Sequence, residues 1–137
     1  IIFFSEMDKV LFSGDTLFSL GCGRVFEGSY EQMFDSLEKI KKLPNSTKIY
    51  CGHEYTDNNG KFCIEIDKDN SKLQKRIKEV RNKIDLNEPT IPVTLQDEIE
   101  TNIFFRYDNE KIKKSVGADN ASNIEVFKKL RNLKDQF

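Results

Sequence analysis

Two short runs of apolar and β-branched residues in the first half of the chain constrain its fold most, because each is followed by a glycine and a side chain that can bind a cation. Asp15 comes after the run Val10–Ser13, and His53 comes after the run Lys48–Cys51. Runs of this length bounded by turn residues are typical of strands. Since α/β proteins build their sites at the carboxyl ends of strands, we expect Asp15 and His53 at the same kind of sheet edge.

The remainder of the first 53 residues completes a layered pattern. Ile1–Phe4 is a further candidate strand, and with Val10–Ser13 it predicts a hairpin or two adjacent strands. Residues Ser29–Gln32 have the form of a capping box, which predicts that a helix begins there. Apolar side chains then follow at helical spacing: Tyr30, Met33, Phe34, Leu37 and Ile40. The order of strands and helix predicts an α/β unit.

After about residue 56 the pattern becomes helical. Thr56 is expected to cap one helix, Thr94–Asp97 is expected to open a short one, and the capping box Ser122–Glu125 is expected to open another. A further, highly charged helix is predicted by one apolar stripe: Leu73, Ile77, Val80 and Ile84. We therefore predict two domains, an α/β unit at residues 1–58 and an all-α domain at residues 59–137.

Composition excludes several classes of protein. The chain has 22 basic and 23 acidic residues and a formal net charge of −1, so no global charge draws it to nucleic acid or to an anionic membrane. No apolar run approaches the ~20 residues that a membrane helix needs. The three cysteines are an odd number without a CxxC pair. They argue against a disulfide framework and for a reducing compartment, which we take to be the cytoplasm, with an organelle as the alternative.

The opening residues Ile1–Phe4 have no initiator Met and have the composition of the inside of a strand. They also lack the basic region, the long apolar core and the cleavage site of a signal peptide. We therefore expect the chain to be a fragment whose N-terminal half is missing. An open apolar strand edge over residues 1–13 could then pair with another chain.

Each candidate site residue also has a purely structural interpretation. Asp15 can be a turn or cap residue, and Gly21–Arg24 can be a plain tight loop rather than backbone that approaches a ligand. A single histidine such as His53 is often a hydrogen-bonded structural imidazole, although imidazole is also the commonest metal ligand. One Asp and one His cannot complete a catalytic zinc site, which takes about three protein ligands and a water.

The last predicted helix carries two basic side chains on one face. Arg131 and Lys134 lie three residues apart, so they are neighbours on the helix surface. They form either a solvated basic surface or a grip for a small carboxylate ligand. Tyr55, close to the histidine in sequence, could donate its hydroxyl to the same ligand.

Seven motifs, in order along nearly the whole chain, resemble the glyoxalase II (hydroxyacylglutathione hydrolase) family. They are GDTLF (14–18), GCGR (21–24), EGS (27–29), YCGHEYT (50–56), NEPTIPVTL (87–95), NIFFR (102–106) and LRNLKDQF (130–137). The resemblance implies the second half of a metallo-β-lactamase αββα sandwich, followed by a helical C-terminal domain that binds glutathione. It covers only the C-terminal half of the enzyme, because the family's His-x-His-x-Asp-His motif and one further His are absent.

The resemblance also implies a reaction and a site. The family hydrolyses S-D-lactoylglutathione to D-lactate and glutathione with a hydroxide held by two divalent metal ions, which we expect to be zinc, with iron or manganese as alternatives. Asp15 would bridge the two metals and His53 would bind one of them. The residues that would contact glutathione are Gly23, Arg24, Tyr55, Arg131 and Lys134. Phe26 stands where the family often has a Tyr, which removes one hydroxyl contact.

Two other functions remain open. A persulfide dioxygenase of the same fold also carries a GCGR loop after a Gly-Asp pair, and a non-catalytic helical interaction module could keep these residues as remnants. The GDTLF motif and the basic pair on the last helix favour the thioesterase. Because the chain carries only two metal ligands, we expect it to be inactive alone and to need its missing N-terminal half. We expect no nucleic acid or membrane partner.

Overall fold

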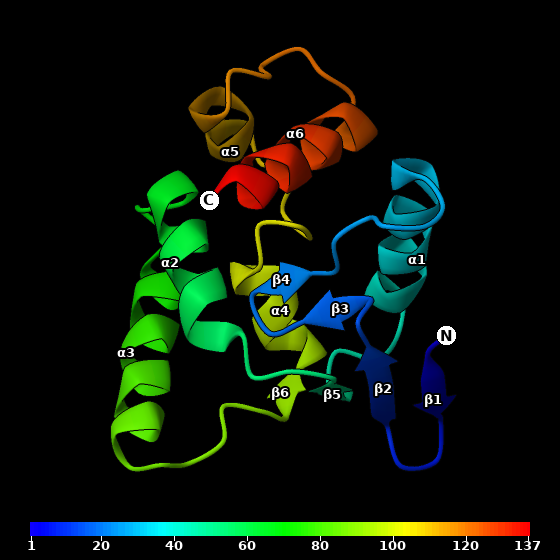
Figure 1. Ribbon diagram of the computed structural model, residues 1–137, viewed down its shortest axis with the longest axis vertical. Coiled ribbons are helices and arrows are strands. Elements are labelled where there is room, and N and C mark those ends of the chain that lie inside the picture. Colours follow the sequence, from blue (N-terminus) through cyan, green and yellow to red (C-terminus); the bar gives the residue numbers. More distant parts are fainter.

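The computed structural model describes residues 1–137 and contains six strands and six helices (Figure 1). The strands are β1 (Phe3–Ser5), β2 (Val10–Gly14), β3 (Leu17–Phe18), β4 (Gly21–Cys22), β5 (Lys48–Cys51) and β6 (Val93–Thr94). The helices are α1 (Tyr30–Lys41), α2 (Thr56–Ile66), α3 (Ser71–Asp85), α4 (Leu95–Thr101), α5 (Glu110–Ser115) and α6 (Asn123–Gln136). None of the helices has the length and apolar character that a membrane span requires.

The main sheet has the strand order β1-β2-β5-β6 and sets the position of the candidate site. β1 and β2 form the antiparallel hairpin that the sequence predicts, whereas β2 and β5 are parallel, with Phe12 opposite Tyr50. The connection between these parallel strands contains α1, as parallel pairing requires a crossover. The carboxyl ends of β2 and β5 therefore meet at one edge, where Gly14 is paired with Cys51.

This sheet has one covered face and one open face. Leu11 and Ile49 are fully buried, whereas Phe3, Phe12 and Tyr50 on the other face are 68%, 54% and 37% exposed. The alternation follows from the two-residue period of a strand. The open face is a strip of aromatic side chains in which the centres of the Phe12 and Tyr50 rings lie 5.6 Å apart, and β1 forms the outer edge of the sheet beside it.

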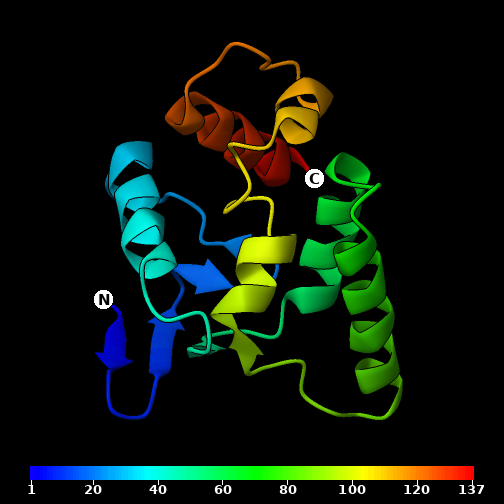
Figure 2. The same ribbon diagram turned by 180° about the vertical axis from the view of Figure 1, so that it is seen from behind.

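Three helices, α1, α4 and α6, begin where the local sequence predicts. Ser29 accepts a hydrogen bond from the backbone N–H of Gln32, and the Gln32 side chain accepts one from the N–H of Ser29, which completes a capping box at the start of α1. A reciprocal box also opens α4, and at the start of α6 the Glu125 carboxylate accepts hydrogen bonds from the N–H and the hydroxyl of Ser122. Figures 1 and 2 show α1 on one side of the molecule, the α2–α3 pair on the opposite side and α6 across one end.

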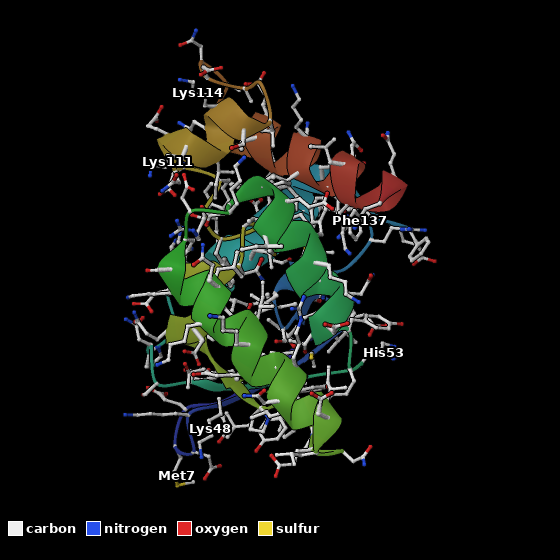
Figure 3. The ribbon with its side chains drawn as sticks, turned by 90° about the vertical axis from the view of Figure 1, so that its left-hand side faces the viewer. Met7, Lys48, His53, Lys111, Lys114 and Phe137 are labelled. Atoms are coloured by element: carbon white, nitrogen blue, oxygen red, sulfur yellow. The ribbon has the colours of Figure 1, made fainter.

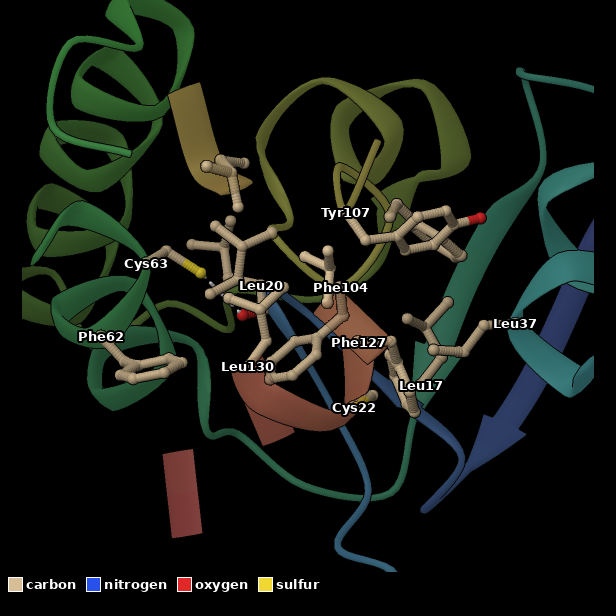
Figure 4. Packing of buried hydrophobic residues seen from close by; sticks show 14 of the residues in the cluster. Leu17, Leu20, Cys22, Leu37, Phe62, Cys63, Phe104, Tyr107, Phe127 and Leu130 are labelled. Carbon is tan, nitrogen blue, oxygen red and sulfur yellow. Dashed lines mark hydrogen bonds between the residues drawn. The ribbon is translucent and has the colours of Figure 1, made fainter. Parts of the chain in front are cut away.

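One hydrophobic core of 21 buried residues joins the α/β part to the helical part (Figure 4). Leu17 and Leu37 from the α/β part belong to the same cluster as Phe104 and Phe127 from the helical part. Residue 58, where the sequence analysis ends the first domain, lies inside α2. The division into two domains stays a prediction, and the fold itself is an α/β unit followed by helices.

The expectation that everything after residue 56 is helical is wrong at one point. β6 pairs with β5 in antiparallel fashion, so a strand from the second half completes the main sheet. The β3–β4 hairpin and α5 were also not anticipated, since a loop was expected around Gly21–Arg24. Strands of two residues carry no periodic pattern and exist only through their partners, so a single sequence does not reveal them.

The predicted role of Thr56 as a helix cap is also wrong. The cap position of α2 is Tyr55, which makes no side-chain capping bond, and Thr56 is the first residue of the helix. The Thr56 hydroxyl lies 2.5 Å from the hydroxyl of Thr90 instead. It ties the start of α2 to the connector that leads into β6.

Candidate functional site

Asp15 and His53 meet at the edge formed by the ends of β2 and β5. His53 Nε2 lies 3.5 Å from Asp15 Oδ1, and both side chains are at least half exposed. Gly52 makes this approach possible, because a Cβ there would come within 2.7 Å of Asp15 Oδ1. The backbone N–H of Gly52 also donates to the carbonyl of Gly14 at 2.9 Å. Gly52 therefore lets the carboxylate and the imidazole point to one place.

This pair suits part of a divalent metal site. A carboxylate and an imidazole are ligands that zinc, iron and manganese all accept. The chain contains no group of three or more His, Cys, Asp or Glu side chains that could hold a metal ion. Asp15 and His53 thus fit as two ligands of a site that takes about three or more from protein, and their metal-binding role stays a prediction.

A cavity of about 460 Å³ opens beside this pair and collects the sequence-derived candidates. All seven of them line it: Asp15, Gly23, Arg24, His53, Tyr55, Arg131 and Lys134. Its other lining residues are Phe18, Cys22, Phe26, Asn58, Asn59, Asp135 and Phe137. Figure 3 shows His53, from the loop after β5, and Phe137, from the end of α6, on the same side of the molecule.

Aromatic packing fixes the loop between β5 and α2. The rings of His53 and Tyr55 are stacked with their centres 4.8 Å apart, and Phe18 packs edge-on against Tyr55 at 5.2 Å. Glu54, which lies between His53 and Tyr55 in the sequence, points away from the cavity. Its carboxylate accepts a hydrogen bond from the backbone N–H of Thr90 at 3.0 Å. Alternate residues of this loop therefore face the cavity and the connector, which is how the CGHEYT motif presents two side chains to the site.

Arg131 is a buried tether rather than an exposed cation. It is only 4% exposed, and its Nη1 donates to the carbonyl of Cys22 at 2.7 Å. Its Nε and Nη2 donate to Asp135 Oδ1 at 3.2 and 2.9 Å. The solvated basic surface considered for this residue is therefore excluded, and most of its donors are already used within the protein.

Lys134 remains without an anionic partner at the cavity. Its Nζ lies 5.3 Å from the centre of the Phe62 ring and 4.9 Å from that of Phe137. Burial lowers the pKa of Lys134, because its ammonium is partly removed from water. The protonated form would gain from a carboxylate, so Lys134 is the member of the basic pair suited to bind an anion.

Cys22 lines the cavity but is not an activated nucleophile. Burial raises the pKa of its thiol to about 11, and the neighbouring Arg131 only partly offsets this effect. The thiolate is the reactive form of cysteine, so this thiol is inert at neutral pH. All three cysteines are free and buried, as the absence of a disulfide framework predicts.

A buried polar network, which the sequence analysis missed, supports the turn that leads into Gly21–Arg24, here called the glycine loop. Glu98 is fully buried and its Oε2 accepts hydrogen bonds from the N–H of Leu20 at 3.0 Å and from Asn102 Nδ2 at 2.8 Å. Its Oε1 pairs with Arg76, which also donates to Ser19 Oγ at 2.9 Å. Leu20 has a φ of +60°, a backbone conformation that needs such support in a residue with a side chain.

Comparison with known proteins adds the family. A family model described as the hydroxyacylglutathione hydrolase C-terminus matches residues 54–137, and the metallo-beta-lactamase superfamily model matches residues 1–53. The hydroxyacylglutathione hydrolase of Pelagibacter ubique is 51% identical over 100% of this chain and 52% of that relative. That of Bartonella tribocorum is 50% identical over 94% of this chain and 51% of that relative. The chain spans about half the length of the curated relatives it matches, and it belongs to the hydroxyacylglutathione hydrolase family.

Proposed function

We propose that this chain is the glutathione-binding part of a thioester hydrolase that converts S-D-lactoylglutathione to D-lactate and glutathione. The observation that carries the proposal is that seven candidate residues from four separate segments line one cavity. That cavity is lined both by a carboxylate–imidazole pair and by a cation without an anionic partner, Lys134. The similarity to hydroxyacylglutathione hydrolases along the whole chain supports the same assignment.

In this proposal Asp15 and His53 are two of the ligands of a metal site completed by groups outside these 137 residues. Two divalent ions would, when bound, lower the pKa of a water molecule and stabilise negative charge on the thioester carbonyl oxygen. We propose zinc, and the same two donors would accept iron or manganese.

The other cavity residues bind and orient the substrate. Lys134 and Arg24 would hold the glutathione carboxylate, and the Tyr55 hydroxyl would donate to the glutathione backbone. Their common task is to keep the thioester carbonyl next to Asp15 and His53, because positioning of this kind lowers the barrier without further chemistry. Phe26 offers a ring beneath Arg24 and no hydroxyl, so one hydrogen bond expected in the family is absent.

The alternatives have weaker support. The match of residues 54–137 to the hydrolase C-terminal model favours thioester hydrolysis over persulfide oxidation. The gathering of seven candidates around one cavity favours an enzyme over a helical interaction module. We also propose a reducing compartment, the cytoplasm, which the three free thiols support.

A first prediction tests the reaction. The 137-residue chain with added zinc should hydrolyse S-D-lactoylglutathione no faster than buffer, because Asp15 and His53 alone do not complete a catalytic site. A chimaera that places the N-terminal half of the Pelagibacter ubique relative before this chain should release glutathione, measured with a thiol reagent. The same chimaera with His53→Ala should lose that activity. Turnover by the chain alone, or none by a folded, metal-loaded chimaera, would contradict the proposal.

A second prediction tests glutathione binding. Lys134→Met should weaken the binding of S-methylglutathione to this chain by about tenfold, since a hydrogen bond to a charged group contributes roughly 1.5–3 kcal/mol. Methionine keeps much of the apolar stem that packs on Phe62 and Phe137. The control is Lys128→Met on the same helix, whose ammonium pairs with Glu31 instead. Isothermal calorimetry that finds equal affinities for both variants would contradict the role of Lys134.

A further inference from the structure

Asp135 joins the two arginines of the cavity through a single oxygen. Its Oδ1 accepts hydrogen bonds from Arg24 Nε at 3.1 Å and from Arg131 Nε and Nη2 at 3.2 and 2.9 Å. Arg24 and Asp135 are 111 residues apart in the sequence, so this contact closes the cavity wall between the glycine loop and the end of α6. The sequence analysis did not identify Asp135.

The position of Asp135 is fixed from the protein side. Arg131 holds it with two N–H groups, and Arg131 is itself buried and bonded to the carbonyl of Cys22. The carboxylate of Asp135 and the buried guanidinium of Arg131 are therefore linked to the glycine loop as one hydrogen-bonded unit. The side chain of Asp135 is 29% exposed and faces the more exposed partner, Arg24, whose side chain is 52% exposed.

Arg24 is held in a way that leaves its binding end free. Its only side-chain hydrogen bond to the protein goes through Nε, and its guanidinium lies 5.8 Å from the centre of the Phe26 ring. The two terminal nitrogens, which carry four of the five N–H donors, have no partner in the protein. A guanidinium gripped at Nε and supported on one face presents these nitrogens as a fork, the geometry that matches a carboxylate.

We propose that Asp135 is a positioning residue that holds Arg24 in this orientation, so that the terminal nitrogens of Arg24 receive a carboxylate of the ligand. This role rests on the proposed function, because the ligand is the glutathione part of the substrate. Asp135 does not bind the ligand itself. Its effect comes from ordering a long side chain before binding, which removes part of the entropy cost that a free Arg24 would pay.

Asp135 could also act in the opposite way, so that removing its carboxylate would raise the affinity for the ligand instead of lowering it. A carboxylate at an anion site repels an anionic ligand and competes for Arg24, so its removal would then tighten binding. Salt and water screen both the repulsion and the Arg24–Asp135 ion pair, but the pair is a direct hydrogen bond at 3.1 Å, whereas a carboxylate held by the terminal nitrogens of Arg24 would lie farther from Asp135. We therefore expect positioning to be the larger effect and removal of the carboxylate to weaken binding.

The first measurement observes Arg24 in the free chain. In nitrogen-15 NMR spectra, the Nε–H of Arg24 should give a resolved, slowly exchanging signal that is absent in Arg24→Met. Asp135→Asn should broaden or shift that signal toward those of solvated arginines. Asp119→Asn, which removes a charge from an exposed residue that does not line the cavity, should leave it unchanged. An unaltered Arg24 signal in Asp135→Asn would overturn the proposal.

The second measurement is a double-mutant cycle for S-methylglutathione affinity. Asp135→Asn should weaken binding by roughly fivefold, the effect expected from a partly exposed ion pair, whereas in an Arg24→Met background it should change affinity by less than about twofold. Equal losses in both backgrounds would mean that Asp135 contacts the ligand or only supports the fold, and tighter binding would mean competition. Either result would overturn the proposal.

The experiments distinguish an error in the proposed glutathione site from an error in the proposed role of Asp135. If the unsubstituted chain shows no saturable binding of S-methylglutathione, the proposed glutathione site is wrong and so is the role of Arg24 in receiving it. The NMR signal of Arg24 would still report whether Asp135 holds that side chain. Binding by the unsubstituted chain together with an unaltered signal in Asp135→Asn would overturn the role of Asp135 alone.

Discussion

Replacing Glu98 by Gln is expected to lower the free energy of unfolding by about 3–5 kcal/mol, because it leaves a buried guanidinium without its counter-charge. Glu98 is fully buried and the Arg76 side chain is 10% exposed. The amide of Gln can still accept from the N–H of Leu20, but its NH₂ group must then face another donor, Arg76. A loss of this size is a large fraction of the roughly 5–15 kcal/mol that stabilises a domain. Urea unfolding followed by circular dichroism measures it.

Two further variants test whether the uncompensated charge of Arg76 causes the loss of stability in Glu98→Gln. Glu79→Gln breaks the exposed pair with Lys75 on the same helix as Arg76 and should leave the unfolding free energy nearly unchanged. Adding Arg76→Met to Glu98→Gln removes the buried charge, so the double variant should be less destabilised than the sum of the single variants. Strictly additive losses would contradict this explanation.

The elements that the sequence predicts well are those defined by local chemistry. The helix starts predicted at Ser29, Thr94 and Ser122 are confirmed, because each depends only on side chains and backbone within four residues. The placement of Asp15 and His53 also follows from local signals, since each comes just after a strand. Their closeness required one further fact, that β2 and β5 are parallel neighbours, which the intervening helix indicates.

The residues that the sequence analysis missed act over long distances along the chain. Asp135 is four residues after Arg131, so their pairing was predictable, but its contact with Arg24 is not a local one. Arg76 lies on the apolar stripe of α3 between Leu73 and Val80, and a charge on such a face is a signal of a buried partner. Nothing local identifies that partner as Glu98, because only packing of α3 on α4 brings them together.

The second large effect is expected from a substitution in the glycine loop beside Asp15. The backbone there leaves no room for a side chain. A Cβ at position 23 would lie 2.0 Å from the backbone carbonyl oxygen of Asp15, and backbone cannot move aside as a flexible side chain can. The N–H of Gly23 also donates to the carbonyl of Thr16 at 3.0 Å. The sequence analysis assigned Gly23 to glutathione binding, and the structure adds that it lets the loop lie directly against the turn that carries Asp15.

Gly23→Ala is therefore expected to push the loop away from Asp15, to lower the free energy of unfolding by about 1–3 kcal/mol and to abolish measurable binding of S-methylglutathione. Binding should suffer more than stability, because Arg24 follows directly and its Nε would lose its alignment with Asp135. Gly60→Ala is the matched control: its Cβ would meet only side-chain atoms of Ile77 and Leu20, at 3.3 Å, inside α2 where alanine is preferred. Unfolding and calorimetry on both variants measure the difference. If Gly23→Ala binds the ligand as well as Gly60→Ala does, the close approach of loop and turn does not shape the site.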